Sequence, residues 1–141
     1  MTPDRPEPAR DVPSGFVMRR IVNPISLALG APSVVVRGRT SGRPIRVLVP
    51  PFLDGGERYL VAGGGETHWV RNLRAAGEAG LRRGRSRERV RAVEVPGAER
   101  DRVVAAYRDR MGRRAAAYFT ALPDPADHPV FRLEPVQAAL G

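Results

Sequence analysis

Two short segments carry the residue types that could do chemistry. Residues 38–44 read GRTSGRP and residues 63–74 read GGGETHWVRNLR, and each follows an apolar run. Arginine presents forked donors that match phosphate or carboxylate oxygens, and glycine lets a ligand approach the backbone closely. Arg39, Thr40 and Ser41 bring a charged fork and two hydroxyls into one turn, which suits a phosphate. We expect the two segments to form one site, at two strand ends, for an anionic ligand with a flat aromatic part.

The second segment offers groups for the flat part of such a ligand. Residues 62–65 present bare backbone against which a ring could lie. Trp69 could add an aromatic wall, and Asn72 can both donate and accept hydrogen bonds. For Trp69 the alternative is an anchor in the core, and for Arg71 and Arg74 it is a solvated helix face.

The positive charge of the chain is concentrated around these segments. All 24 basic residues are arginine, so Schiff-base and other lysine chemistry is excluded. Residues 37–46 hold four arginines and no acid, and residues 71–91 hold eight arginines and two glutamates. Because the net charge is +9, the rest of the chain is close to neutral. A positive field confined to these stretches would attract and hold an anion.

Most catalytic chemistry that a protein supplies by itself is missing. The chain has no cysteine, and its two histidines, His68 and His128, are far apart in sequence, so neither a disulfide nor a metal site is expected. No Gly-x-Ser-x-Gly elbow occurs, and no Gly-x-Gly-x-x-Gly opens a helix after a strand. These absences leave a binding protein, or an enzyme whose cofactor carries the reactive chemistry.

Length and composition predict one globular domain. The chain has 141 residues with 42% hydrophobic content. Residues 1–13 hold four prolines and are expected to be a disordered lead, and residues 14–141 are expected to form the domain. Without a spanning apolar stretch or a signal peptide, the prediction is a cytoplasmic protein. A helix at residues 14–29 is expected to pack on the domain, and its alternative is contact with a membrane surface.

Periodicity and turn residues predict an α+β chain that is mainly β, with peripheral helices. Thr67 and Gly77 are expected to bound a short helix, and Gly84 is expected to turn a hairpin. The expected strands are 33–37, 45–53, 58–62, 79–83, 87–95 and 129–133, and the expected helices are 68–76 and 99–114, the second continuing toward residue 122. Strands joined mostly by hairpins favour a small β-barrel.

Several motifs share their order and spacing with one protein family. They are GRxSGxP from residue 38, YLVAG from 59, WxxNLRA from 69, LRRG from 81, RAVEV from 91 and FRLEP from 131. Over roughly residues 15–135 the chain resembles the deazaflavin-dependent nitroreductase family, which includes actinobacterial split-barrel oxidoreductases and quinone reductases.

The resemblance implies a split β-barrel, similar to FMN-binding barrels, that binds the 8-hydroxy-5-deazaflavin coenzyme F-420. The implied activity is hydride transfer from the reduced coenzyme to a small hydrophobic acceptor, which is a quinone, an enone or a nitro compound. The implied cofactor-binding residues are Arg39, Thr40, Ser41, Arg46, Pro50, Ala62, Gly63, Gly64, His68, Trp69, Arg71 and Asn72. Tyr107 and Tyr118 are the expected catalytic residues, as proton donors or hydrogen-bond donors to the acceptor.

Two departures from the family pattern keep alternatives open. Many members carry a basic residue where this chain has Thr40, and another where it has Gly64. Weaker anion contacts would suit a related split-barrel protein that binds FMN, or that stores or carries a flavin-like ligand without turnover. A nucleic-acid binder is disfavoured because residues 81–91 lack aromatic side chains for base stacking. Both a monomer and a homodimer fit the sequence.

Overall fold

The computed structural model describes residues 32–136. The predicted lead at residues 1–13 and the predicted helix at residues 14–29 lie outside the described residues. In chain order the elements are β1 (Ser33–Arg37), β2 (Pro44–Val47), β3 (Phe52–Asp54), β4 (Glu57–Val61), α3 (His68–Ala76), β5 (Glu78–Arg83), β6 (Ser86–Glu94), α4 (Gly97–Met111), η1 (Gly112–Ala115), α5 (Ala116–Ala121), η2 (Pro125–Asp127) and β7 (Val130–Pro135). In this part of the chain, no helix has the length and hydropathy needed to cross a bilayer.

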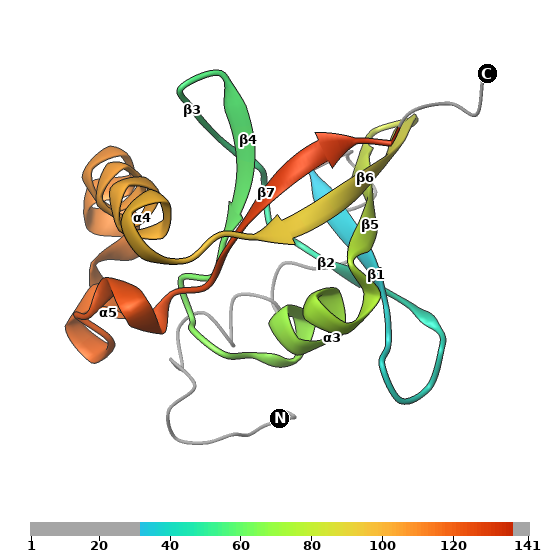
Figure 1. The fold of residues 1–141 in the computed structure, drawn as a ribbon, viewed down its shortest axis with the longest axis horizontal. Helices are drawn as coiled ribbons and strands as arrows, with labels where there is room; N and C mark the ends of the chain where they lie inside the picture. Colours follow the sequence, from blue (N-terminus) through green and yellow to red (C-terminus); the bar gives the residue numbers. More distant parts are fainter. Residues whose placement is uncertain (1–31, 137–141) are drawn as a thin grey trace.

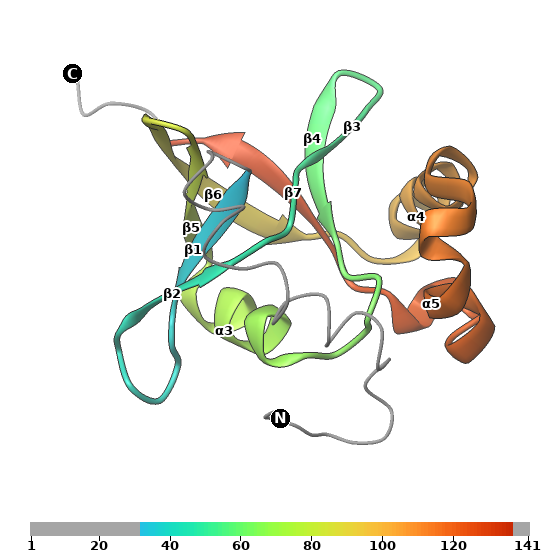
Figure 2. The same ribbon diagram turned by 180° about the vertical axis from the view of Figure 1, so that it is seen from behind.

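The seven described strands form one antiparallel sheet in the order β2-β1-β5-β6-β7-β4-β3. Figures 1 and 2 show the sheet curled, with β6 and β7 across its middle, β1, β2 and β5 on one side, and the β3–β4 hairpin on the other. α3 packs against one face of the sheet, and α4 and α5 pack against the other. This arrangement confirms the expected mainly β, split-barrel class.

The inner face of the curled sheet holds the larger hydrophobic core, and α3 covers it. Val70 and Leu73 of α3 are fully buried against side chains from β1, β2, β4, β5, β6 and β7. The helix has the predicted bounds, and Gly77 ends it with φ 74°, a left-handed conformation that favours glycine. Thr67 occupies the N-cap position, but its side chain does not make the predicted capping hydrogen bond.

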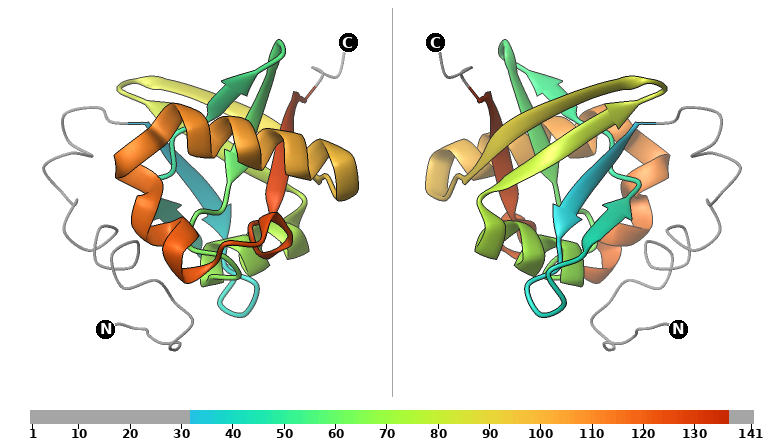
Figure 3. Two further views of the ribbon diagram at one scale, coloured as in Figure 1. Left: turned by 90° about the vertical axis from the view of Figure 1, so that its left-hand side faces the viewer. Right: turned by 90° about the vertical axis from the view of Figure 1, so that its right-hand side faces the viewer.

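The outer face of β3, β4 and β7 is covered by α4 and α5, which carry the second hydrophobic core (Figure 3). Val103 of α4 and Phe119 of α5 are buried there. At the edge of this core the Glu99 carboxylate accepts hydrogen bonds from the Tyr59 hydroxyl at 2.8 Å and from Arg132 Nη1 at 3.0 Å. The first turn of α4 is thereby fixed to β4 and β7.

The predicted strand at residues 45–53 is wrong in extent, because it is two strands. β2 ends at Val47 and β3 begins at Phe52, with Pro50 and Pro51 between them. Proline has no N–H to donate to a sheet ladder, so the double proline ends the pairing. The two strands lie at opposite edges of the sheet. The long helix also ends earlier than predicted, at Met111, and a 3₁₀ turn at residues 112–115 leads into α5.

Replacing Glu99 by Ala is expected to lower the free energy of unfolding by about 1–2 kcal/mol at neutral pH, because Tyr59 and Arg132 lose their shared acceptor. Hydrogen bonds from Tyr59 and Arg132 lower the pKa of Glu99, so this contribution is present at neutral pH and is lost as the pH falls through that lowered pKa. Urea unfolding at several pH values measures the difference. Asp109→Ala, on the exposed side of the same helix, is the control, and equal losses in both variants would contradict the assignment.

Candidate functional site

The β1–β2 turn holds Arg39 in a closed loop of backbone hydrogen bonds. Gly38 N–H donates to Arg43 O at 2.8 Å, and Gly42 N–H donates to Gly38 O at 2.9 Å. Gly42 has φ 74°, which a side chain would make unfavourable. Ser41 Oγ accepts the Arg43 N–H at 3.1 Å, so this predicted phosphate ligand stabilises the turn itself.

Arg39 reaches from this turn to the first turns of α3. Its Nη1 donates to Asn72 Oδ1 at 2.6 Å, and its backbone N–H donates to the same oxygen at 3.1 Å. Arg39 Nη2 lies 3.3 Å from His68 Nδ1. Asn72 is only 5% exposed and lies one helical turn after His68. The structure thus brings together three predicted site residues from the two segments, and their role in binding a cofactor stays a prediction.

The first turn of α3 carries no negative charge that would repel an anion, because it contains no acidic side chain. The Thr67 Oγ1 atom is buried and makes no hydrogen bond within residues 32–136. Free N–H groups and the positive end of the helix dipole favour an anion at such a terminus. Together with the Arg39 guanidinium, the arrangement suits a phosphate or carboxylate group.

The two glycines that follow the end of β4, Gly63 and Gly64, have different surroundings. A Cβ built on Gly63 would lie 2.8 Å from Tyr118 Cδ2, so the Tyr118 ring already fills the space over this residue. A Cβ on Gly64 would meet only Thr67 Cγ2, at 3.6 Å. Ala62, just before, is buried. The bare backbone that could face a ligand ring is therefore at Gly64, and the aromatic ring on Gly63 is the protein's own.

The two predicted catalytic tyrosines lie close to each other. Tyr107 of α4 packs edge-on against Phe52, with ring centroids 5.4 Å apart, and its ring lies 6.4 Å from that of Phe119. Burial, and then the neighbouring Tyr118, raise the pKa of Tyr107 to about 12. A hydroxyl in this environment keeps its proton and can donate a hydrogen bond throughout the neutral range.

His128 is a residue of the site that the sequence did not indicate. It is fully buried, with Nδ1 at 3.0 Å from Ala62 O and Nε2 at 2.7 Å from Leu122 O. Its ring lies tilted against that of Phe119, with the ring centroids 4.5 Å apart. The imidazole therefore ties the end of β4 to the residue that follows α5, and so helps to place Tyr118 on Gly63.

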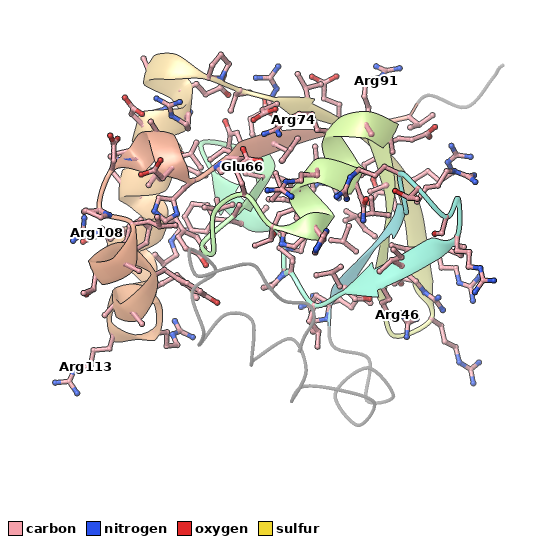
Figure 4. The ribbon with its side chains drawn as sticks, turned by 90° about the horizontal axis from the view of Figure 1, so that it is seen from below. Arg46, Glu66, Arg74, Arg91, Arg108 and Arg113 are labelled. Carbon is pink, nitrogen blue, oxygen red and sulfur yellow. The ribbon has the colours of Figure 1, made fainter. Side chains whose placement is uncertain are left out.

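An ion-pair cluster holds the loop between β4 and α3. Arg74 donates to both oxygens of Glu66, at 3.1 and 2.9 Å, and to both oxygens of Glu94, at 2.7 and 2.9 Å. Figure 4 shows Arg74 and Glu66 side by side near the centre of the view. Arg74 thus links the glycine loop to β6, so its expected alternative, a solvated helix face, describes only part of its surroundings.

The remaining predicted cofactor residues are more dispersed. Trp69 is 7% exposed and lies in the inner core, 6.5 Å from the Phe131 ring. Thr40 is exposed in the Arg39 turn, and Arg71 is exposed on α3. Pro50 is exposed between β2 and β3, and Arg46 lies on the outer face of β2. Apart from Trp69, which belongs to the inner core, these residues lie at the surface.

A comparison with protein families identifies the class. A family model described as F420H(2)-dependent quinone reductase matches residues 18–121. The chain belongs to this family. The match confirms the resemblance seen in the sequence, and it identifies the protein as a reductase that uses coenzyme F-420, with FMN as the secondary alternative.

Solved structures support the fold assignment of this quinone reductase family member. A structure described as an F420-H2 dependent reductase (FDR-A) shares 22% identity over 73% of this chain and 92% of its own, with TM-score 0.58. A second, described as a domain-swapped dimer, shares 22% over 73% and 78%, with TM-score 0.58. HutZ, a heme storage protein from Vibrio cholerae, shares 18% over 76% and 82%, with TM-score 0.54. A search of curated proteins gave no match.

The residues present fit the coenzyme of the quinone reductase family. Coenzyme F-420 combines a flat deazaflavin ring with an anionic part. The anionic part is matched by Arg39 and by the Thr67 hydroxyl at the start of α3, which has no hydrogen-bond partner among residues 32–136. The ring is matched by the open backbone of Gly64. No carboxylate hydrogen-bonds to Arg39 within the described range to oppose the anion.

Replacing Gly63 by Ala is expected to lower the free energy of unfolding by about 1–3 kcal/mol, because the new methyl group would overlap the Tyr118 ring. Gly64→Ala is the matched control, since its methyl group would make an ordinary contact. Chemical denaturation of both variants measures the effect. In the double variant Gly63→Ala, Tyr118→Ala the overlap is removed, so an undiminished cost of Gly63→Ala there would contradict the contact.

The raised pKa of Tyr107 predicts a loss of stability in alkaline solution. Between about pH 10 and pH 12 the unfolded chain ionises this tyrosine and the folded chain does not, so the folded state loses up to about 2 kcal/mol as the pH rises. Tyr107→Phe should remove this component of the pH dependence. Urea unfolding of both proteins from about pH 9 to about pH 12 measures it, and parallel curves would contradict the buried environment of the hydroxyl.

Proposed function

We propose that the protein reduces a quinone with hydride from reduced coenzyme F-420, bound between the β1–β2 turn and the N-terminus of α3. The observation that carries this proposal is the anchoring of Arg39 on Asn72 beside an α3 terminus whose Thr67 hydroxyl has no partner in the described chain. The family supplies the coenzyme and the reaction class. The choice of a quinone over an enone or a nitro compound is our proposal.

The protein's part in the reaction is to bind and orient. When bound, the reduced deazaflavin supplies the hydride. Arg39 and Thr67 would hold the anionic part of the coenzyme, and the N–H groups of the first α3 turn would add donors. Asn72 holds Arg39 in its orientation, so this guanidinium does not have to be ordered when the coenzyme binds.

The tyrosines would act on the acceptor. A quinone that accepts hydride gains negative charge on its carbonyl oxygens, and a neutral hydroxyl at that position stabilises the charge and can donate a proton. The Tyr118 ring lies over Gly63, which follows the end of β4. The Tyr107 hydroxyl keeps its proton because its pKa is raised. The apolar side chains around them, Phe52 and Phe119, would suit a hydrophobic acceptor and exclude water.

We also propose a domain organisation and an oligomeric state. Residues 14–141 would form a single domain, which is supported by the one sheet that all seven described strands share, and residues 1–13 would precede it. A homodimer is supported by the similar structure that is described as a domain-swapped dimer. Membrane contact through residues 14–29 remains a prediction from the sequence.

Binding measurements test the coenzyme site directly. Fluorescence titration of the purified protein should show saturable binding of coenzyme F-420 and weaker binding of FMN. Arg39→Ala should weaken coenzyme binding by about 1–3 kcal/mol, the range for a lost charged hydrogen bond. Arg43→Ala, in the same turn, removes the same charge from a guanidinium that makes no hydrogen bond or ion pair with the described residues, and it should have the smaller effect. Equal effects would contradict the placement of the anionic part.

Single-turnover kinetics test the acceptor. The reduced coenzyme should be oxidised faster by a soluble quinone than by an enone or a nitroaromatic compound. Tyr118→Phe should slow the oxidation by about 10²-fold or more if the hydroxyl acts as general acid, with coenzyme affinity unchanged. Binding without oxidation of the reduced coenzyme by any of the three acceptors would instead support the carrier alternative.

A further inference from the structure

Three arginines lie on one part of the outer sheet face, over β2, β5 and β6. In the strand register Arg46 lies opposite Val35 of β1, Ser33 of β1 lies opposite Arg82, and Arg82 lies opposite Arg87. Because directly paired residues and residues two apart in a strand share a face, all three arginine side chains lie on the same side of the sheet. Figure 4 shows Arg46 at the β2 side of the molecule, far from Arg108 and Arg113 of the helical layer.

Two neighbouring arginines of this outer face, both on β6, differ because they have acidic partners. Arg89 is hydrogen-bonded to Glu78, and Arg91 lies 3.8 Å from Glu134. Within residues 32–136, no ion pair forms at Arg46, Arg82 or Arg87. The fold therefore balances part of this face with carboxylates and leaves the three-arginine cluster unbalanced.

Arg82 lies at the centre of the cluster and is the least satisfied of the three. Its Nε atom is buried and has no hydrogen-bond acceptor among the described residues. Burial, followed by repulsion from Arg46 and Arg87, lowers the pKa of Arg82. A buried donor without an acceptor and three neighbouring like charges both destabilise the folded protein. Both effects would be relieved by one bound anion.

We propose that Arg46, Arg82 and Arg87 bind a small oxyanion, a phosphate or carboxylate group, on the outer face of the sheet. Arginine forks match both groups in bidentate geometry. The side chains that project from the sheet between the three arginines are short. They are Ser33 and Val35 of β1, and Gly80 of β5 has none. The guanidinium groups can therefore converge over small residues without a bulky side chain between them.

This oxyanion site is separate from the Arg39 cluster. Arg82 pairs with Ser33 at the start of β1, and the Arg39 turn follows the end of β1, on the order of 15 Å further along the strand. The inference does not rest on the proposed function, since its ligand can be inorganic phosphate and its readout needs no coenzyme.

Thermal unfolding in phosphate tests the site. At constant ionic strength, kept with NaCl, phosphate at about ten times its Kd should raise the melting temperature of the unaltered protein by about 5 °C. Arg82→Gln should abolish this rise. Arg85→Gln, which removes an exposed arginine from the adjacent hairpin turn, should keep it. Equal phosphate responses in the three proteins, or no response in any, would overturn the proposal.

A second variant, a second anion and an NMR measurement make the test specific. Arg87→Gln removes an exposed member of the cluster and gives the same test if the Arg82 variant does not fold. Citrate in place of phosphate identifies the preferred oxyanion, because the larger shift at equal ionic strength shows whether carboxylate or phosphate fits better. A chemical-shift change of the Arg82 Nε–H resonance on adding the anion would place it at the buried donor, and an unchanged resonance at saturation would contradict that placement.

Discussion

The candidate site depends on the contact between the Arg39 guanidinium and the Asn72 side chain. A single buried amide oxygen accepts both the side-chain and the backbone N–H of Arg39, and so fixes the β1–β2 turn on the first helix that follows the glycine loop. Without that acceptor, a long side chain on an exposed turn would have many rotamers. The contact brings together two segments that are distant in sequence, at the surface where we propose that the anionic part of the coenzyme binds.

The rest of the fold supports this surface from both sides. On the inner side, α3 is held by Val70 and Leu73 in the core and by Arg74, which pairs with acids from the glycine loop and from β6. On the outer side, α4 and α5 place two tyrosines near the end of β4, and His128 ties this strand end to the end of α5. The coenzyme side and the acceptor side of the proposed site therefore belong to different layers that meet at Gly63.

Local features of the fold were predictable from the sequence, and features that depend on strand order were not. The bounds of α3 follow from its flanking Thr67 and Gly77, and the β5–β6 turn follows from Gly84. Pro50 and Pro51 end the strand pairing, but no local pattern shows that the strands on their two sides belong to opposite sheet edges. Topology of that kind is decided by non-local pairing.

The site shows the same division. Arg39 stood out because an arginine suits anion binding, and Asn72 stood out because its amide can both donate and accept hydrogen bonds. His128 did not, because its importance comes from two backbone carbonyls that only the folded chain brings to it. The cluster of Arg46, Arg82 and Arg87 was visible only as an excess of charge, since it forms through the register of β1 between two other strands.

The separation of β2 and β3 has a geometric consequence for the whole sheet. Seven strands laid flat would place the two edges about 29 Å apart, since neighbouring strands are spaced by about 4.8 Å. The chain from Val47 to Phe52 can span at most about 18 Å when fully extended. The short proline-containing connection therefore acts as a covalent tether between the two margins, and the sheet remains rolled even where no hydrogen bonds close it.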